Sequence, residues 1–290
     1  MTTPPTFRPA TPAQRRPGGS EHDAGQASAG TSAGQETAPE QRWRPPRLWL
    51  FALWLSNGLV RLLCRLRVTT SMDYRLTAGP LILAGNHISL IDPIVLMAAA
   101  RQLRIAPRIM ATGGLFRTPI LGPLMRRVGH ISVDRGRDTV TQALPDAIGA
   151  LRGGAIVMIY PEGRIGLDPQ MWPEKAKTGI ARLALATGAP VVPVAIWGSH
   201  EMIAYHGGLS MTARVLGSAF RRPRVNVHFG QQVDLSDLVL GAVGHAQRGS
   251  ERIMAAIDAA LVPLRPDEPR LPRWQDPTRP VSIARVRDRG

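Results

Sequence analysis

Two residues five positions apart, His87 and Asp92, have side chains that together can act as a general base. A carboxylate in contact with one imidazole nitrogen holds the ring and stabilises its protonated form, while the other nitrogen faces the substrate. Such a pair needs no serine or cysteine nucleophile. We therefore expect it to remove a proton from a substrate hydroxyl, which then attacks an acyl carbonyl without a covalent enzyme intermediate.

The segment around this pair predicts a turn between a strand and a helix. An apolar run over 80–86 leads directly into His87. Asp92 followed by Pro93 is typical of a helix start, with Asp at the N-cap and Pro at the first helical position. Backbone amides at that start are candidate donors to the oxyanion. The alternative is a helix cap and a turn histidine with no catalytic task, because this spacing often occurs by chance.

Arg135 and Arg164 follow two further expected strands and could bind a phosphate group. A guanidinium group can clamp a phosphate through two parallel hydrogen bonds. Gly163 lacks a Cβ, so backbone amides could approach an anion there. Glu162 could orient an arginine or the acceptor hydroxyl. The alternative is that Asp134–Arg135 and Glu162–Arg164 are ordinary surface ion pairs.

Two later segments complete the candidate site. Lys177 lies near the start of a helix expected over 176–187, where its ammonium group could reach an anion, although it could also mark an exposed helix start. The next apolar strand contains Val192, Pro193 and Val194. A proline within a strand indicates interrupted pairing or an edge position. These three residues could belong to the core or line an acyl-chain channel.

Positioning these residues requires a scaffold, and from residue 79 the sequence alternates short apolar strands with helical patterns. This alternation predicts a layered α/β fold with a largely parallel β-sheet flanked by helices. Ligands bind beyond the carboxyl ends of the strands in such sheets, where the segments above fall. The expected strands cover 80–86, 104–111, 129–134, 155–161, 190–198 and 224–230, and the expected helices cover 93–101, 115–127, 138–152, 176–187 and 250–262.

The composition narrows the class of partner. A chain of 290 residues that is 44% hydrophobic suits one sizeable domain with tails. The net charge of +15 indicates an anionic partner, such as a phospholipid surface, a phosphorylated substrate or nucleic acid. Aromatic residues make up only 5% of the chain, so we expect no nucleic-acid partner. The lone Cys64 excludes an internal disulfide, and the histidine spacings imply no metal.

The chain also divides into regions by composition. Residues 1–42 almost lack large apolar side chains and should be a disordered tail, and no signal peptide follows Met1. Residues 43–67 hold an apolar run shorter than the ~20 residues that span a bilayer. We expect a helix at the membrane interface there, with a helix buried against the domain and a true span as alternatives. Residues 68–262 form the expected catalytic domain and 263–290 a tail rich in Pro and Arg. The expected membrane contacts are Arg47, Trp49, Phe51, Trp54, Arg61 and Arg65.

Taken in order, these segments resemble the glycerolipid acyltransferase family, which includes the 1-acylglycerol-3-phosphate (lysophosphatidic acid) acyltransferases. The resemblance covers roughly residues 75–230 and rests on four blocks in fixed order, with a linking K-x-G-x-x-x-L-A run. Four ordered blocks are far more specific than any one of them. They are matched here by Asn86, His87 and Asp92; by Gly129, Asp134 and Arg135; by Glu162 and Gly163; and by Val191 to Ala195 around Pro193, with the linking run at Lys177, Gly179, Leu183 and Ala184.

The resemblance implies a glycerol-phosphate acyltransferase-like fold, a dyad of His87 and Asp92, and phosphate binding around Arg135 and Glu162–Arg164. It implies acyl-CoA or acyl carrier protein as co-substrate, with no cofactor, and transfer to lysophosphatidic acid, giving phosphatidic acid. We expect a peripheral or monotopic protein on anionic phospholipid at the cytoplasmic face of the cell membrane.

The third block departs from the family, because Arg164 stands one position earlier than the usual arginine and no serine follows. Acylation of another lysophospholipid or a glycolipid is therefore the alternative within this class. A basic membrane- or nucleic-acid-binding protein without catalysis is the alternative outside it.

Overall fold

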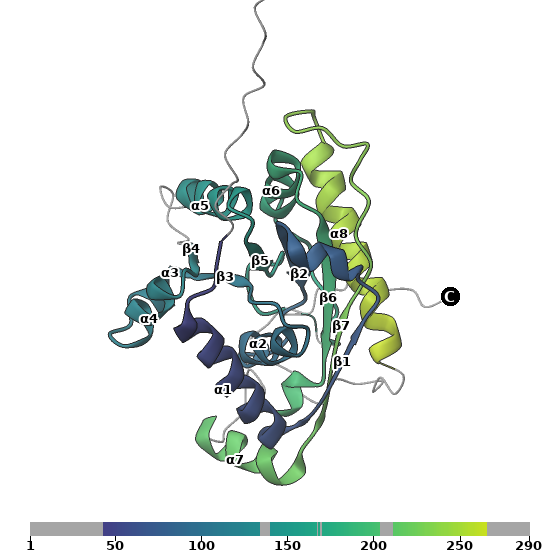
Figure 1. The fold of residues 1–290 in the computed structure, drawn as a ribbon. Coiled ribbons are helices and arrows are strands. Elements are labelled where there is room, and N and C mark those ends of the chain that lie inside the picture. Colours follow the sequence, from purple (N-terminus) through teal and green to yellow (C-terminus); the bar gives the residue numbers. More distant parts are fainter. Residues whose placement is uncertain (1–42, 134–139, 167, 169, 204–210, 266–290) are drawn as a thin grey trace, which may run out of the picture. The chain divides into compact units, whose positions relative to one another are not determined.

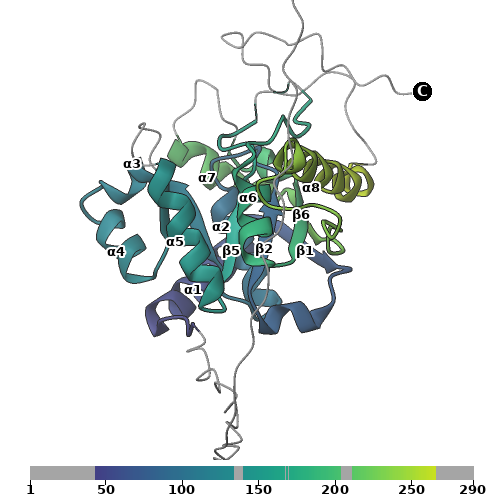
Figure 2. The ribbon, with the colours of Figure 1, turned by 90° about the horizontal axis from the view of Figure 1, so that it is seen from above.

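The computed structural model describes residues 43–133, 140–166, 168, 170–203 and 211–265. The two expected tails therefore lie outside the described residues, apart from 263–265. Within the described part, helices cover both faces of one β-sheet (Figure 1). In the view from above in Figure 2, α5, α6 and α8 follow one another across the front of the strands.

The sheet has seven strands. They are β1 (Arg65–Thr70), β2 (Leu81–Gly85), β3 (Arg108–Thr112), β4 (Ile131–Val133), β5 (Ile156–Ile159), β6 (Val191–Trp197) and β7 (Arg224–Phe229). Their order is β1-β7-β6-β2-β5-β3-β4, and every neighbouring pair is parallel except β6 and β7. The expected largely parallel α/β sheet flanked by helices is confirmed.

The helices sort onto the two faces by their buried residues. The α-helices are α1 (Arg47–Leu63), α2 (Asp92–Gln102), α3 (Gly113–Phe116), α4 (Leu121–Arg127), α5 (Val140–Arg152), α6 (Gly179–Thr187), α7 (Met211–Arg221) and α8 (His245–Leu261). The 3-10 helices are η1 (Tyr74–Ala78), η2 (Ser199–Glu201) and η3 (Val262–Leu264). One hydrophobic cluster joins α1 and α2 to the sheet, and the other joins α5, α6 and α8 to its opposite face.

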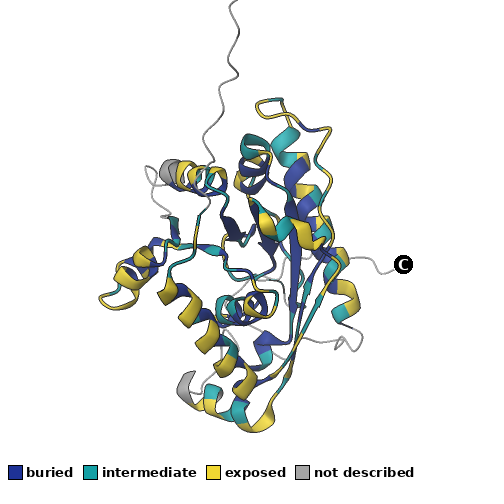
Figure 3. Cartoon of the chain, viewed as in Figure 1, coloured by how far each residue is buried: buried dark blue, intermediate teal, exposed yellow. Residues whose placement is uncertain are grey.

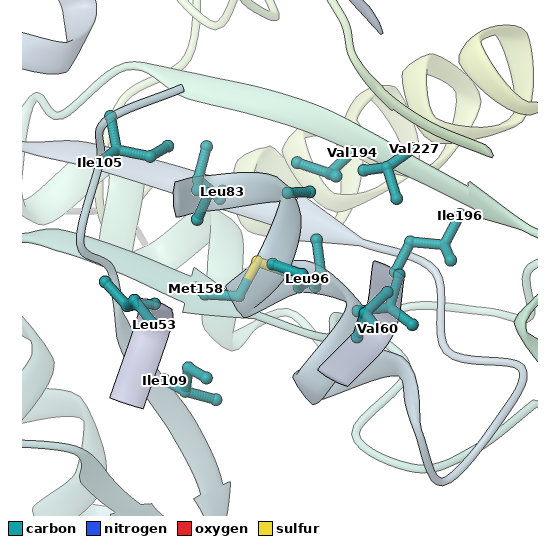
Figure 4. Packing of buried hydrophobic residues seen from close by; sticks show 14 of the residues in the cluster. Leu53, Val60, Leu83, Leu96, Ile105, Ile109, Met158, Val194, Ile196 and Val227 are labelled. Atoms are coloured by element: carbon teal, nitrogen blue, oxygen red, sulfur yellow. The ribbon is translucent and has the colours of Figure 1, made fainter. Parts of the chain in front are cut away.

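Successive side chains of β2 belong alternately to the two hydrophobic clusters. Leu83 packs with α1 and α2, whereas its neighbours Ile82 and Ala84 pack with α5, α6 and α8. Successive side chains of a strand point to opposite faces, so a strand covered on both sides is apolar throughout. Figure 4 shows Leu83 beside Met158 and Leu96 in the first cluster.

Several expected elements need correction. The helix expected over 43–67 ends at Leu63, and residues 65–70 form an unexpected edge strand whose Leu66 and Val68 pack inward. Arg65 therefore lies on β1 and not on the helix. The helix expected over 115–127 is two short helices, and α7 was not expected at all.

The edge position considered for Pro193 is wrong, because β6 lies between β7 and β2. The alternative of interrupted pairing holds on the β7 side only, because Pro193 pairs in register with Ala84 of β2. The ladder between β6 and β7 covers Val194–Trp197 and stops before Pro193. The missing N–H of proline therefore costs no ladder hydrogen bond, and its carbonyl accepts one from Gly230 N at 2.8 Å.

Helix α1 has one buried face and one exposed apolar face (Figure 3). Trp49 is only 3% exposed and packs edge-on against His130, which corrects its expected membrane contact. Phe51 and Trp54 lie on the other face and are 56% and 58% exposed. Helix α1 thus packs against the domain and also presents apolar side chains outward. No helix among the described residues has both the length and the hydrophobicity needed to cross a membrane.

Candidate active site

His87 and Asp92 meet at the turn between β2 and α2. Nδ1 of His87 is 2.8 Å from Oδ2 of Asp92. The Asp92 side chain is fully buried, whereas that of His87 keeps 15% exposure. The two side chains that the sequence analysis paired are therefore in contact. Because the carboxylate takes up Nδ1, it leaves Nε2 as the nitrogen that can meet a substrate.

The Asp92 carboxylate is held by three further donors. Its Oδ2 accepts hydrogen bonds from the backbone amides of Ile88 at 2.7 Å and Ser89 at 2.8 Å. Its Oδ1 accepts one from the hydroxyl of Ser199 at 2.5 Å. Asp92 is the first residue of α2 and Ile91 is the N-cap, so Asp92 and Pro93 each lie one position further into the helix than expected. The Asp92 side chain turns back over the preceding loop. The amides of Ile88 and Ser89 therefore already donate to Asp92, and the oxyanion role expected of the amides at the helix start stays a prediction.

The turn that carries His87 is fixed by hydrogen bonds and by ring stacking with the residues around it. Asn86 is fully buried and exchanges two hydrogen bonds with the backbone of Ile196, at 2.9 and 2.7 Å. Ser89 Oγ donates to the carbonyl of Ile203 at 2.6 Å. The ring of Tyr160, just after β5, stacks on the His87 ring with centroids 4.2 Å apart. Packing on one ring face and the carboxylate at Nδ1 together define the imidazole orientation.

Glu162 lies behind this turn and is only 5% exposed. Its Oε1 accepts a hydrogen bond from the His87 amide at 3.2 Å, and its Oε2 accepts one from the Glu174 amide at 2.9 Å. Burial raises the pKa of Glu162 to about 7, against the opposing effect of these two amides. Glu162 therefore connects the turn that carries His87 to the loop that follows β5.

Gly163 and Lys177 are brought together in this loop. Gly163 has a φ of +69°, the left-handed region that favours glycine. A Cβ placed on it would lie 3.1 to 3.3 Å from the outer carbons and Nζ of Lys177. The Lys177 amide also donates to the carbonyl of Pro161 at 3.0 Å. The lysine side chain thus runs across the Glu-Gly block, where the sequence analysis placed a phosphate.

The two arginines of the expected phosphate site differ. Nη2 of Arg164 lies 2.8 Å from Oε2 of Glu174, which is 7% exposed against 52% for the arginine side chain. The guanidinium group of Arg164 therefore forms an ion pair with a carboxylate that the sequence analysis did not single out. Arg135 and its neighbour Asp134 lie outside the described residues, just beyond the end of β4.

Val192 and Val194, two of the residues expected to line an acyl channel, are fully buried in the cluster between the sheet and α1 and α2. Figure 4 shows Val194 there. Pro193 is buried too, and its ring lies close to Gly230. The channel role stays a prediction. Among the described residues, no three His, Cys, Asp or Glu side chains gather to hold a metal ion.

Arg265 is a residue that the sequence analysis missed. Its guanidinium group stacks at 4.0 Å on the rings of both Trp172 and Trp197. It also donates to the carbonyls of Gln170 at 2.6 Å and Met171 at 3.3 Å. Met171 has a φ of +62°, so this arginine holds a strained turn. That turn leads into Glu174, and Trp197 ends β6 just before Ser199. Arg265 therefore joins two segments that contact the candidate site.

Comparison with known proteins points in one direction. Residues 65–197 match the family model described as Acyltransferase. A lyso-ornithine lipid O-acyltransferase of Rhizobium meliloti is 28% identical over 65% of this chain and 68% of its own length. The 1-acyl-sn-glycerol-3-phosphate acyltransferase BAT2 of Brassica napus is 27% identical over 43% of this chain and 35% of its own. The chain thus spans about two thirds of the first relative and about one third of the second.

A solved structure has a similar fold. It is the 1-acyl-sn-glycerophosphate (LPA) acyltransferase PlsC from Thermotoga maritima, with a TM-score of 0.54 and 18% identity. The match covers 79% of this chain and 83% of that one. The expected fold and the resemblance found in the sequence blocks are both confirmed.

Proposed function

We propose that this chain, an acyltransferase by the family match over residues 65–197, acylates the free hydroxyl of a lysophospholipid. The proposed acceptor is 1-acylglycerol-3-phosphate, the product is phosphatidic acid, and the donor is a fatty acyl thioester of CoA or acyl carrier protein. The observation that carries the proposal is the 2.8 Å contact between His87 Nδ1 and the buried carboxylate of Asp92.

The reaction follows from the protonation states that this contact favours. With Nδ1–H donated to Asp92, Nε2 of His87 carries a lone pair and accepts the proton of the acceptor hydroxyl. The alkoxide oxygen forms a bond to the thioester carbonyl carbon, and the tetrahedral intermediate then breaks its C–S bond. The proton held on Nε2 passes to the leaving thiolate. The ester and a free thiol are formed, and the enzyme returns to its starting state.

The surroundings of Asp92 support this role for His87. Four donors converge on the carboxylate, namely the His87 ring, two backbone amides and the Ser199 hydroxyl. A carboxylate fixed in this way stabilises the imidazolium ion formed during proton transfer without moving. A general base contributes roughly 10² to 10⁴-fold to the rate, so positioning of both substrates must supply the remainder.

Lys177 is the described cation that best supports a phosphate-bearing acceptor. Its side chain crosses Gly163 next to Glu162, which contacts the His87 amide. We propose that Lys177 and Arg135 bind the acceptor phosphate together. Arg164 contributes less, because it already shares Glu174.

A lyso-ornithine lipid is the second candidate acceptor. The relative of that name matches 65% of this chain, whereas the 1-acyl-sn-glycerol-3-phosphate acyltransferase BAT2 matches 43%. The third block also lacks its usual arginine spacing, and the arginine present pairs with Glu174. A phosphate-free acceptor needs no second guanidinium group at this place.

The exposed face of α1 supports a membrane-bound location for the reaction. Phe51 and Trp54 are more than half exposed, and so is Leu62 at 63%. Exposed arginines, Arg47 and Arg61, stand at the two ends of the helix. We propose that this face binds anionic phospholipid and that the protein is peripheral or monotopic at the cytoplasmic face of the cell membrane.

An acceptor panel tests the proposal. The purified full chain is supplied with labelled acyl-CoA or acyl carrier protein and with lysophosphatidic acid, lysophosphatidylglycerol, lysophosphatidylethanolamine, a lyso-ornithine lipid and a lysoglycolipid. We expect the highest kcat/KM with lysophosphatidic acid. A preference for the lyso-ornithine lipid would replace the first candidate by the second. Absence of transfer to any lipid hydroxyl with either donor would refute both.

A further inference from the structure

We propose that α7 is a second membrane-contacting helix, which together with the C-terminal end of α1 seats the catalytic edge of the sheet on an anionic phospholipid bilayer. This inference rests on the proposed function in one respect, because a lipid acceptor must reach His87 from a membrane. It adds an element and an orientation that the sequence did not predict.

Helix α7 has an apolar stripe facing outward. Leu216 and Phe220 are 60% and 90% exposed and are four residues apart, so they lie on one side of the helix. The opposite side packs inward through Val215 and Ala219, with Ser218 fully buried. A surface helix usually carries polar residues on its outer side, so this arrangement indicates a partner for the apolar stripe.

Helix α7 contacts α1, which has an exposed apolar face of its own. Figures 1 and 3 show α7 beside the end of α1. Nη2 of Arg222, the residue after α7, donates to the carbonyl of Arg61 in the last turn of α1 at 2.7 Å. Leu59 and Leu62 near this end of α1 are 42% and 63% exposed. Four large apolar side chains from two helices are thus presented outward near one junction.

Arginines surround this junction. Arg61, Arg65, Arg221, Arg222 and Arg224 are all exposed. Arg65 and Arg224 are register partners at the starts of β1 and β7, which places like charges on adjacent strands. The structure gives none of the five an ion pair with an acidic side chain of the described residues. Such a cluster is stabilised when anionic groups bind it, and lipid phosphates around an apolar patch have this pattern.

The junction lies at the edge of the sheet that holds the candidate active site. Strand β7 runs antiparallel to β6, so Asn226 near its start pairs with Trp197 at the end of β6. Ser199, two residues after Trp197, donates to Asp92. Because α1 and α7 both end where β1 and β7 begin, a bilayer against this junction would lie beside the catalytic turn.

A second exposed apolar group provides a matched control. Leu240 and Val243 are 53% and 97% exposed in the loop that follows β7. This loop begins at the other end of that strand, whose six residues span about 20 Å. These two side chains match Leu216 and Phe220 in exposure and apolar character, and they stand at the opposite edge.

The test is co-sedimentation of the full chain with vesicles of 70% phosphatidylcholine and 30% phosphatidylglycerol. The double variant Leu216→Ser/Phe220→Ser should bind at least tenfold more weakly than the wild type, whereas Leu240→Ser/Val243→Ser should bind as the wild type does. Phe220→Trp should retain binding, because tryptophan favours the interface. Pure phosphatidylcholine vesicles should weaken wild-type binding by a similar factor.

Activity separates this inference from the proposed function. With a short-chain, water-soluble acceptor, the α7 double variant should keep wild-type turnover, whereas with acceptor embedded in vesicles its rate should fall in parallel with binding. Unchanged vesicle binding, or an equal loss in the control pair, would overturn the proposal. Loss of folding in the α7 variant would also overturn it, because the two side chains would then be needed for packing inside the protein. If self-association is lost instead, the face binds a second copy and the proposal fails.

Discussion

The hydroxyl of Ser199 lies 2.5 Å from Oδ1 of Asp92, although 107 positions separate the two residues in the sequence. Ser199 comes just after β6, and Asp92 begins α2 next to β2, which pairs with β6. The hydrogen bond thus links two strand ends at the carboxyl edge of the sheet. The Ser199 hydroxyl thus helps to fix the Asp92 carboxylate, which in turn contacts the ring of His87.

Replacing Ser199 by alanine should lower kcat about tenfold and leave KM unchanged, because one charge-assisted hydrogen bond to Asp92 is lost while three donors remain. Ser199→Thr should restore most of the rate. Ser56→Ala is the matched control and should leave kcat unchanged, since the buried hydroxyl of Ser56 donates to the Leu53 carbonyl within α1. Steady-state kinetics of these three variants test the prediction. A Ser199→Ala enzyme with wild-type kcat would contradict it.

His87→Ala and Asp92→Asn should each reduce kcat by at least about 10²-fold, the contribution of a general base. Asparagine can keep the contacts of Asp92, with its oxygen accepting from the two amides and its NH₂ group donating to Ser199, so mainly the charge is removed. Vesicle binding and the melting temperature should stay close to wild type for both variants. His228→Ala, at a histidine that contacts Thr69 on β1, serves as the control. Full turnover by Asp92→Asn would refute the dyad.

The sequence predicted the contact of the dyad because both residues belong to one strand–turn–helix segment. The apolar strands, the Asp-Pro helix start and the ordered blocks are all local signals, and they led to the correct fold class. Ser199 and Arg265 carry no such signal, because their partners lie far away in the sequence. Only the pairing of β2 with β6 and the packing of the chain after α8 bring them to the site.

Lys177→Gln should raise the KM for a phosphate-bearing acceptor by roughly 10- to 100-fold, as expected when a charge-assisted hydrogen bond to phosphate is lost. Arg164→Gln should have a smaller effect, since this guanidinium group already pairs with Glu174. Lys175, the other lysine of the chain, is exposed two positions earlier and gives the matched control Lys175→Gln. Equal KM values for the two lysine variants would remove Lys177 from the phosphate site.

The raised pKa of Glu162, about 7 against 4.5 for an ordinary glutamate, makes a specific contribution to stability. Between these two pH values the folded state holds a proton that the unfolded state has released. This contribution is therefore largest below pH 4.5 and is lost as pH rises toward 7. Glu162→Gln cannot titrate, so the wild-type free energy of unfolding should fall relative to the variant by a few kcal/mol over this range. Urea unfolding at several pH values measures the difference, and parallel curves would contradict it.

Arg265→Gln should lower kcat and loosen the turn at Met171, because the guanidinium group holds two carbonyls and two tryptophan rings at once. Arg265→Lys should rescue little, since an ammonium group cannot stack and fork in the same way. Limited proteolysis of the loop and kcat should change together. Arg252→Gln, which breaks an exposed ion pair with Asp237, should change neither.

The elements that the sequence analysis missed share a physical cause. Strand β1 is only six residues long, and its arginines interrupt the apolar pattern, because an edge strand exposes alternate side chains. Helix α7 exposes Leu216 and Phe220, so its apolar residues do not fall on a single inward face. Trp49 was assigned to the membrane with Phe51 and Trp54, yet they lie on opposite sides of α1. Which of these three side chains are buried depends on how α1 packs against the domain, and the amino-acid composition does not reveal that packing.

One residue, Cys64, separates the end of α1 from the start of β1, and its side chain is buried. A connection this short has no slack, and Arg65 at once continues into six register pairs with β7. The helix therefore cannot tilt or lift independently without breaking strand pairs at the sheet edge. A surface that binds α1 therefore fixes the orientation of the whole domain. It also fixes the direction from which a substrate approaches His87.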